Sequence, residues 1–134
     1  MVEATARWTD QERFLGIASS GHAIVIDAAK DKTANSPMEL VLIGLCGCTA
    51  YDVVSILRKK REPFTNVEVH AEAQRAPDPP SVYTEIKLIY RVAGTVSRKA
   101  VEDAVQLSKN KYCSVSAMLQ KTAKITVEIE YVDQ

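Results

Sequence analysis

The sequence places three cysteines where thiol chemistry is feasible. Cys46 and Cys48 lie in the apolar segment 38–57, and Cys113 lies nearer the C-terminus. Thiolates act as nucleophiles and metal ligands, whereas buried free cysteines are often small packing groups. The three residues are therefore structural thiols, metal ligands or redox groups, and their surroundings must decide among these roles.

A metal site is not expected from these residues. Cys46 and Cys48 are two positions apart on a predicted helix, and side chains at that spacing do not face each other. Structural zinc sites usually take four ligands, and neither His22 nor His70 has ligand-like spacing to a cysteine. We interpret both histidines as solvated strand residues and predict neither a metal nor another cofactor.

Cys48 has two interpretations. As a free cysteine in an apolar helix, it is most simply a small buried side chain. The second interpretation is a reactive thiol, and Gly44 and Gly47 favour it. Each glycine weakens a helix interior by up to about 1 kcal/mol relative to alanine, so its presence suggests a role other than helix stability. Glycines in a buried helix often let a backbone or a ligand approach closely, so Cys48 is a candidate reactive thiol.

Cys113 also has two interpretations, and the residues alone leave both open. It falls at the predicted start of a helix with Lys109 and Lys111 nearby, and both features favour a thiolate. The alternative is a half-buried cysteine packed beside Tyr112. One buried thiol and one at a helix start would suit a dithiol peroxidase. The first thiolate becomes a sulfenic acid, and the second condenses with it to a disulfide that an external dithiol reduces.

The elements that position these thiols follow from hydrophobic periodicity. Ser36, Pro37 and Glu39 form a capping pattern for a helix that runs to about residue 60. Its middle is apolar nearly all round, which predicts a central, buried helix. Ser97 starts a second helix, Asn110 breaks its pattern, and a third helix is expected at 112–123. Alternating apolar and polar residues predict strands at 2–9, 13–18, 22–27, 67–73, 82–92 and 125–131.

This order of elements predicts an α+β fold with a mainly antiparallel sheet and helices packed against it. A single domain, 1–134, is expected from the length and from an apolar content of 46%.

The charge balance argues against a nucleic-acid partner, because the 17 basic and 17 acidic residues cancel. The basic segment 58–61 suits a solvated helix end. Glu39 and Asp52 argue against a membrane span in 38–57. The N-terminus has no apolar signal core, so a cytoplasmic location is expected.

Three motifs, SPMEL at 36–40, Cys48 and CSVS at 113–116, resemble those of the OsmC/Ohr family of bacterial hydroperoxide-resistance proteins. The segment 36–40, SPMEL, is similar to the family's Asn-Pro-Glu-x-Leu helix start. Cys48 has the spacing of the family's peroxidatic cysteine, and the segment 113–116, CSVS, is similar to its second-cysteine helix. The order of elements matches over essentially the whole chain.

The resemblance implies an OsmC-like fold that forms an intertwined homodimer, with the long central helices buried side by side and the active sites at the subunit interface. It also implies that Cys48 is the peroxidatic residue and Cys113 the resolving residue, reduced by a dithiol such as a lipoyl group. In the active branches, an arginine from the N-terminal strands and a glutamate at the helix start support the thiolate. Arg13 and Glu39 are the nearest candidates here, although Met38 holds the aligned glutamate position.

The expected activity is therefore reduction of organic hydroperoxides by a two-cysteine cycle, with Cys46 an extra thiol assigned to core packing. The departure at Met38 keeps an alternative open, in which the same dimer binds a small hydrophobic molecule or senses redox state without efficient turnover. A purely structural dimer is a third, weaker interpretation.

Overall fold

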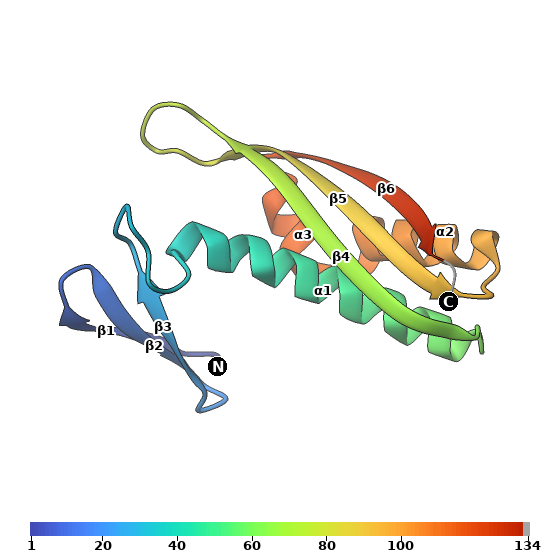
Figure 1. Ribbon diagram of the computed structural model, residues 1–134, viewed down its shortest axis with the longest axis horizontal. Helices are drawn as coiled ribbons and strands as arrows, with labels where there is room; N and C mark the ends of the chain where they lie inside the picture. The colour runs from blue at the N-terminus through green and yellow to red at the C-terminus, as the bar shows by residue number, and fades with distance from the viewer. Residues whose placement is uncertain (133–134) are drawn as a thin grey trace. The chain divides into compact units, whose positions relative to one another are not determined.

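The computed structural model describes residues 1–132, and its contacts divide the chain into two compact units that meet within one helix, between Ile43 and Gly44. The units are described separately. In chain order the elements are β1 (Ala4–Asp10), β2 (Arg13–Ala18), β3 (Ala23–Asp27), α1 (Pro37–Lys59), β4 (Phe64–Arg75), β5 (Tyr83–Gly94), α2 (Arg98–Leu107), the π-helical turn η1 (Ser108–Tyr112), α3 (Ser114–Leu119) and β6 (Lys124–Val132) (Figure 1).

The first unit is an antiparallel sheet in the order β1-β2-β3, followed by a loop and the start of α1. The buried carboxylate of Asp27, at the end of β3, organises the loop. It accepts backbone N–H groups of Thr33 and Ala29, both at 2.9 Å, and the Thr33 hydroxyl at 2.7 Å. These hydrogen bonds lower the pKa of Asp27 to about 2.

The predicted capping pattern is confirmed at the start of α1. The Ser36 N–H donates to Glu39 Oε1 at 2.8 Å, and the Glu39 N–H donates to Ser36 Oγ at 3.2 Å. Each residue thus satisfies a backbone donor that the first helical turn leaves without a partner. The hydrogen bond from the Ser36 backbone lowers the pKa of Glu39.

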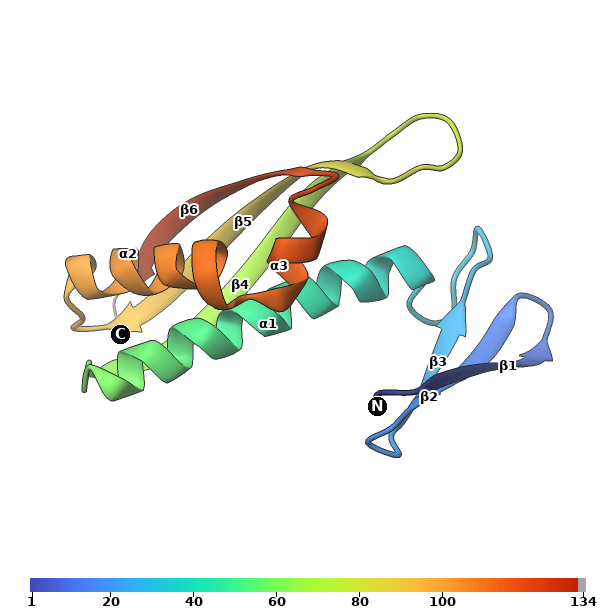
Figure 2. The same cartoon turned by 180° about the vertical axis from the view of Figure 1, so that it is seen from behind.

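The second unit is a sheet in the order β4-β5-β6, with α2, α3 and the adjoining length of α1 against one face (Figures 1 and 2). β4 and β5 are antiparallel, whereas β5 and β6 are parallel. A parallel pair needs a crossover connection, which α2, η1 and α3 supply. The α+β class is confirmed. The single sheet expected from the sequence is replaced by two three-stranded sheets, because strand alternation does not reveal which strands pair.

The core of the second unit is built from three surfaces. β5 contributes most of its side chains because helices cover one of its faces and strands flank it on both edges. α1 contributes one stripe at four-residue spacing, and α2 contributes a second stripe below its Ser97 cap. The fully buried side chains include Leu45, Thr49, Val53, Leu57, Ile86, Leu88, Tyr90, Val92, Val101 and Val105.

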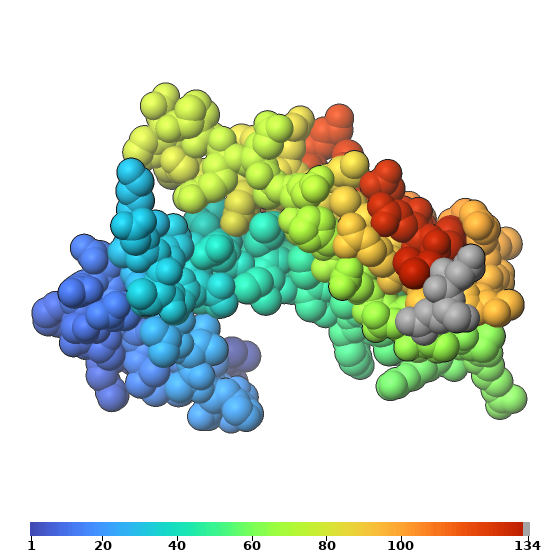
Figure 3. Space-filling model, in the orientation of Figure 1, coloured from blue at the N-terminus to red at the C-terminus, as the bar shows by residue number. Residues whose placement is uncertain are grey.

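The helix α1 is buried along one side only within the chain, whereas its sequence predicted burial nearly all round. Ile43 and Tyr51 are 52% and 72% exposed. A methyl group added at Gly44 or Gly47 would meet no other part of the described chain within 4 Å, so the close approach expected at these glycines is absent from it. Atoms of α1 are visible at the surface in Figure 3. By length and composition α1 could also span a membrane.

The third predicted helix is shorter than its pattern. α3 covers Ser114–Leu119 instead of 112–123, and Tyr112 belongs to η1. In η1 the Cys113 N–H donates to the Ser108 carbonyl at 2.8 Å, which is the wide hydrogen bond of a π-helical turn. This turn lies beside the thiols and sets the positions of both Ser108 and Cys113.

Candidate active site

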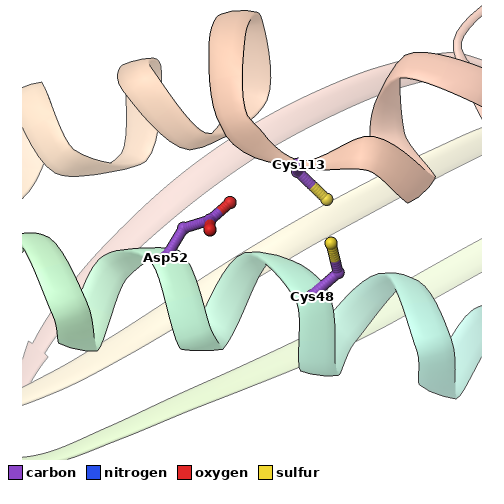
Figure 4. A group of neighbouring side chains, drawn as sticks. All are labelled: Cys48, Asp52 and Cys113. Carbon is purple, nitrogen blue, oxygen red and sulfur yellow. The ribbon is translucent and has the colours of Figure 1, made fainter.

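The structure brings Cys48 and Cys113 together and adds a residue that the sequence did not single out. The Sγ atoms of Cys48 and Cys113 and a carboxylate oxygen of Asp52 all lie within 4.8 Å of one another. In Figure 4, Cys48 and Asp52 project from α1 toward Cys113, which lies between η1 and α3. All three cysteines are free thiols.

Cys48 and Asp52 share one face of α1 because they are four positions apart. Both are half-buried. Thr49, next to Cys48, lies in the buried stripe of the helix, so packing of that stripe fixes how α1 presents the pair. Cys48 is therefore the more accessible of the two clustered thiols, since only 2% of Cys113 is exposed.

Cys113 is the N-cap of α3, where its Sγ accepts the Ser116 N–H at 3.3 Å. Burial raises the pKa of this thiol, and its hydrogen bond with Cys48 and the charge of Asp52 act in the same direction. The thiolate suggested by the neighbouring lysines is therefore not favoured. Lys111 instead lies over the Tyr112 ring, 5.3 Å from its centre.

A chain of buried hydroxyl groups ends at Asp52. Ser108 Oγ donates to Asp52 Oδ2 at 2.9 Å, Thr49 Oγ1 lies 2.7 Å from Ser108 Oγ, and the Tyr90 hydroxyl lies 2.7 Å from Thr49 Oγ1. Each hydroxyl has one proton. Since Ser108 donates to the carboxylate, Thr49 must donate to Ser108 and Tyr90 to Thr49. Burial raises the pKa of Tyr90 to about 12, which keeps this terminal donor protonated.

Asp52 was not predicted as a site residue, although one feature of the sequence marks it. It is an acidic residue inside an apolar helix and stands four positions after Cys48. Thr49, Tyr90 and Ser108 carry no such signal, because hydroxyl groups are common in cores when they are hydrogen-bonded. Only the packing of α1 against β5 and η1 shows that they form a chain.

Arg13 and Glu39 have local partners within the first unit. Arg13 Nη2 pairs with Asp10 Oδ2 at 2.7 Å and Nη1 donates to Thr33 Oγ1 at 3.3 Å. Its hydrogen bond with Asp10 raises the pKa of Arg13. Glu39 is held in the capping box with Ser36. The supporting roles predicted for these two residues stay predictions.

Cys46 is not part of the cluster of Cys48, Asp52 and Cys113. It is half-buried, and burial raises its pKa. Both histidines are exposed, with His22 beside Ser20 and His70 in β4 beside Glu72, as the sequence indicated. In the second unit, His70 lies on the exposed side of β4 and is not a member of the cluster of Cys48, Asp52 and Cys113.

A cavity of about 360 Å³ adjoins Asp52 in the second unit. Aromatic and aliphatic side chains form half of its lining, which also includes Lys59, the last residue of α1, and Lys60, which follows it. This is the volume of a small ligand pocket. Its lining residues are Tyr51, Asp52, Ser55, Ile56, Lys59, Lys60, Leu107 and Tyr112.

Comparison with known proteins agrees with the observed architecture. Protein YhfA of Escherichia coli is 42% identical over 132 residues, which cover 98% of each chain. The crystal structure of a hypothetical protein from Aquifex aeolicus is 31% identical, with a TM-score of 0.91 over 100% of this chain and 98% of that one. The organic hydroperoxide resistance protein OhrB of Bacillus subtilis shares the fold, with a TM-score of 0.71 at 13% identity, over 97% of this chain and 98% of that one.

The sequence pattern of the OsmC-like protein family matches residues 29–128, which include the whole of α1 and the cysteine pair. The family resemblance drawn from SPMEL, Cys48 and CSVS is thereby confirmed. The chain belongs to the OsmC family.

Proposed function

We propose that this protein is a thiol-dependent peroxidase that reduces organic hydroperoxides. The Cys48 thiolate attacks the distal oxygen of R–O–O–H, which breaks the O–O bond and yields the Cys48 sulfenic acid and, after protonation, the alcohol R–OH. The Cys113 thiol then condenses with the sulfenic acid to a disulfide and releases water. An external dithiol, such as a lipoyl group, reduces the disulfide and is itself oxidised.

One observation carries the proposal: two free thiols from distant parts of the chain lie within 4.8 Å of each other. A disulfide needs an S–S distance of about 2.05 Å, so the two sulfur atoms must move closer together before the bond forms. The order of attack follows from exposure and charge. Cys48 is accessible to a peroxide, whereas the buried Cys113 retains its proton and can supply it to the departing hydroxide of the sulfenic acid.

The cavity beside Asp52 supports an organic substrate. Tyr51, Ile56 and Tyr112 on its wall offer apolar contacts to the alkyl or aryl group of a hydroperoxide. Hydrogen peroxide has no such group and would gain nothing from these contacts. We therefore expect larger organic hydroperoxides to react faster than hydrogen peroxide.

We further propose that the protein is a homodimer with its active site at the subunit interface. The exposed side of α1 carries Ile43 and Tyr51, and the positions of Gly44 and Gly47 leave room for another chain to come close. Burial of such a surface by a second copy would account for a helix that is apolar nearly all round.

We also propose a cytoplasmic location, which suits a protein with free thiols. Neither a nucleic acid nor a membrane is among the proposed partners.

The test is a peroxidase assay with reduced protein, cumene hydroperoxide and dihydrolipoamide. Turnover should vanish in Cys48→Ser and persist in Cys46→Ser, which removes the neighbouring thiol outside the cluster. Cys113→Ser should give one equivalent of Cys48 sulfenic acid, detectable with dimedone. After oxidation, mass spectrometry should find a disulfide between Cys48 and Cys113 within one chain. Peroxide loss no faster than with free dithiol would reject the proposal.

A second candidate function is the binding of a small hydrophobic molecule. It is favoured because Arg13 is paired with Asp10 and Glu39 is hydrogen-bonded to Ser36, so both predicted supporting side chains already have partners. Without a free cation at the reacting thiol, peroxide reduction would be slow. This alternative predicts that a solvatochromic dye binds to the reduced protein and that Tyr51→Glu abolishes the binding. The peroxidase rate would then equal that of free dithiol.

A further inference from the structure

We propose that Cys48, Asp52 and Cys113 form a reduced-state binding site for a thiophilic divalent cation, with Zn²⁺ as its ligand. Their three donor atoms already lie within 4.8 Å of one another. Tetrahedral zinc, with Zn–S bonds of about 2.3 Å and Zn–O bonds of about 2.0 Å, places its ligand atoms roughly 3.5 to 3.8 Å apart. A slight closure of the three side chains around the cation would therefore complete the site.

The elements present these ligands in a manner suited to a metal. Cys48 and Asp52 are four positions apart on α1, the spacing at which a helix directs two ligands to one ion. Cys113 comes from a separate segment and faces them (Figure 4). The sequence argument against a metal considered Cys46 with Cys48 and the two histidines, and it did not consider a carboxylate one helical turn away.

Outer hydrogen bonds already orient two of the three ligands. Asp52 Oδ2 accepts from Ser108, whose hydroxyl is fixed in turn by Thr49 and Tyr90. Cys113 Sγ accepts the Ser116 N–H. Such partners hold metal ligands in place, and their loss commonly weakens metal affinity by about 10- to 100-fold. A carboxylate held by the Ser108 hydroxyl, which Thr49 and Tyr90 fix in turn, is better prepared as a ligand than a surface acidic residue.

Charge also favours a cation. With both thiols deprotonated, the cluster would carry three negative charges. In the described part of the chain, Asp52 forms no ion pair with a lysine or arginine. Zn²⁺ would release the two thiol protons and replace them with its own charge. Two sulfur ligands select Zn²⁺ over Mg²⁺ and Ca²⁺, which prefer oxygen.

Three protein ligands leave one tetrahedral position for water or a substrate atom. The metal and the disulfide would use the same two sulfur atoms, so each state excludes the other. Zinc would therefore hold the thiols reduced and delay their oxidation. This regulatory consequence rests on the proposed peroxidase function, whereas metal binding itself does not.

The experiment titrates reduced, chelator-treated protein with Zn²⁺ by calorimetry and with Cd²⁺ by its thiolate charge-transfer absorption. One ion should bind per chain, and Cys46→Ser should bind with the same affinity. Ser108→Ala should bind about 10- to 100-fold more weakly, Asp52→Asn more weakly still, and Cys48→Ser or oxidised protein should show no thiolate–cadmium band. Circular dichroism would verify that Asp52→Asn, whose changed group is half-buried, retains the fold.

The proposal is overturned if reduced wild-type protein binds Zn²⁺ no more tightly than Cys48→Ser, or if Cys46→Ser loses binding. Peroxidase turnover is measured separately in the presence of a chelator. Turnover without Zn²⁺ binding would reject the metal site and leave the peroxidase proposal intact. Zn²⁺ binding without turnover would reject the peroxidase proposal and leave the metal site intact.

Discussion

Ser108 and Asp52 are 56 positions apart in the sequence, yet the Ser108 hydroxyl donates to Asp52 Oδ2 at 2.9 Å. This hydrogen bond joins the π-helical turn to α1 at the level of the two thiols. It also fixes the direction of the hydroxyl chain through Thr49 to Tyr90. A buried serine thus supports the candidate active site from the π-helical turn.

Replacement of Ser108 by alanine should destabilise the protein by about 1 to 3 kcal/mol, because Thr49 loses its buried acceptor and Asp52 loses a donor. Urea unfolding followed by circular dichroism measures this change in the free energy of unfolding. The matched control is Ser114→Ala, since Ser114 is exposed in the neighbouring α3. Equal stability of the two variants would show that the hydroxyl chain contributes nothing.

The stability contribution of Cys113 should decline at alkaline pH. Because its pKa is raised in the folded state, the unfolded chain releases the thiol proton first as pH rises. The contribution is complete below about pH 8.5, the value for an unfolded cysteine, and is lost as pH rises toward the folded pKa. The stability difference between wild type and Cys113→Ala should therefore shrink between pH 8 and pH 10, by urea unfolding.

A control for this pH dependence is Val101→Ala, which removes a buried side chain without a titrating group. Its stability difference from wild type should be the same at each pH. If the Cys113→Ala difference also stays constant, burial does not raise the pKa of this thiol.

Asp27 should stabilise the first unit at neutral pH and lose this effect in acid. Its hydrogen bonds from Thr33 and Ala29 lower its pKa to about 2, so its contribution is present in full above about pH 4 and is lost as pH falls toward 2. Asp27→Asn should accelerate hydrogen exchange of the Ala29 and Thr33 amides at pH 6. In urea unfolding, the variant and wild type should converge near pH 2.

The exposed Asp31, in the same loop, provides the control for Asp27. Asp31→Asn should leave the exchange of both amides unchanged at pH 6. A difference between wild type and Asp27→Asn that persists undiminished at pH 2 would contradict the role assigned to the carboxylate.

Gly47→Ala tests whether a second copy covers α1. In the isolated chain the added methyl group meets nothing within 4 Å, so the substitution should stabilise the helix by about 1 kcal/mol. In the proposed homodimer the same methyl group would separate the subunits and weaken dimerisation by at least tenfold. Analytical ultracentrifugation measures the dimer dissociation constant. An unchanged constant, with a more stable chain, would place the interface elsewhere.

Local patterns in the sequence were sufficient for most of the elements and for the caps at Ser36 and Ser97. Ser36 and Glu39 form their capping box because both partners lie within one turn of the same helix. Strand alternation likewise depends on adjacent residues, so most strands were predicted within a few positions of their bounds. The family motifs around Cys48 and Cys113 singled out the two thiols that the structure brings together.

The sequence by itself thus determined the α+β class, the order of the elements and the two clustered cysteines. Only the tertiary structure decided that β6 pairs in parallel with β5, that α1 is buried on one side, and that Asp52 joins the thiols. The physical reason is the range of the interactions. Capping and periodicity act between neighbours in the chain, whereas the hydrogen bonds of Asp52, Ser108, Thr49 and Tyr90 form only after α1, β5 and η1 have packed together.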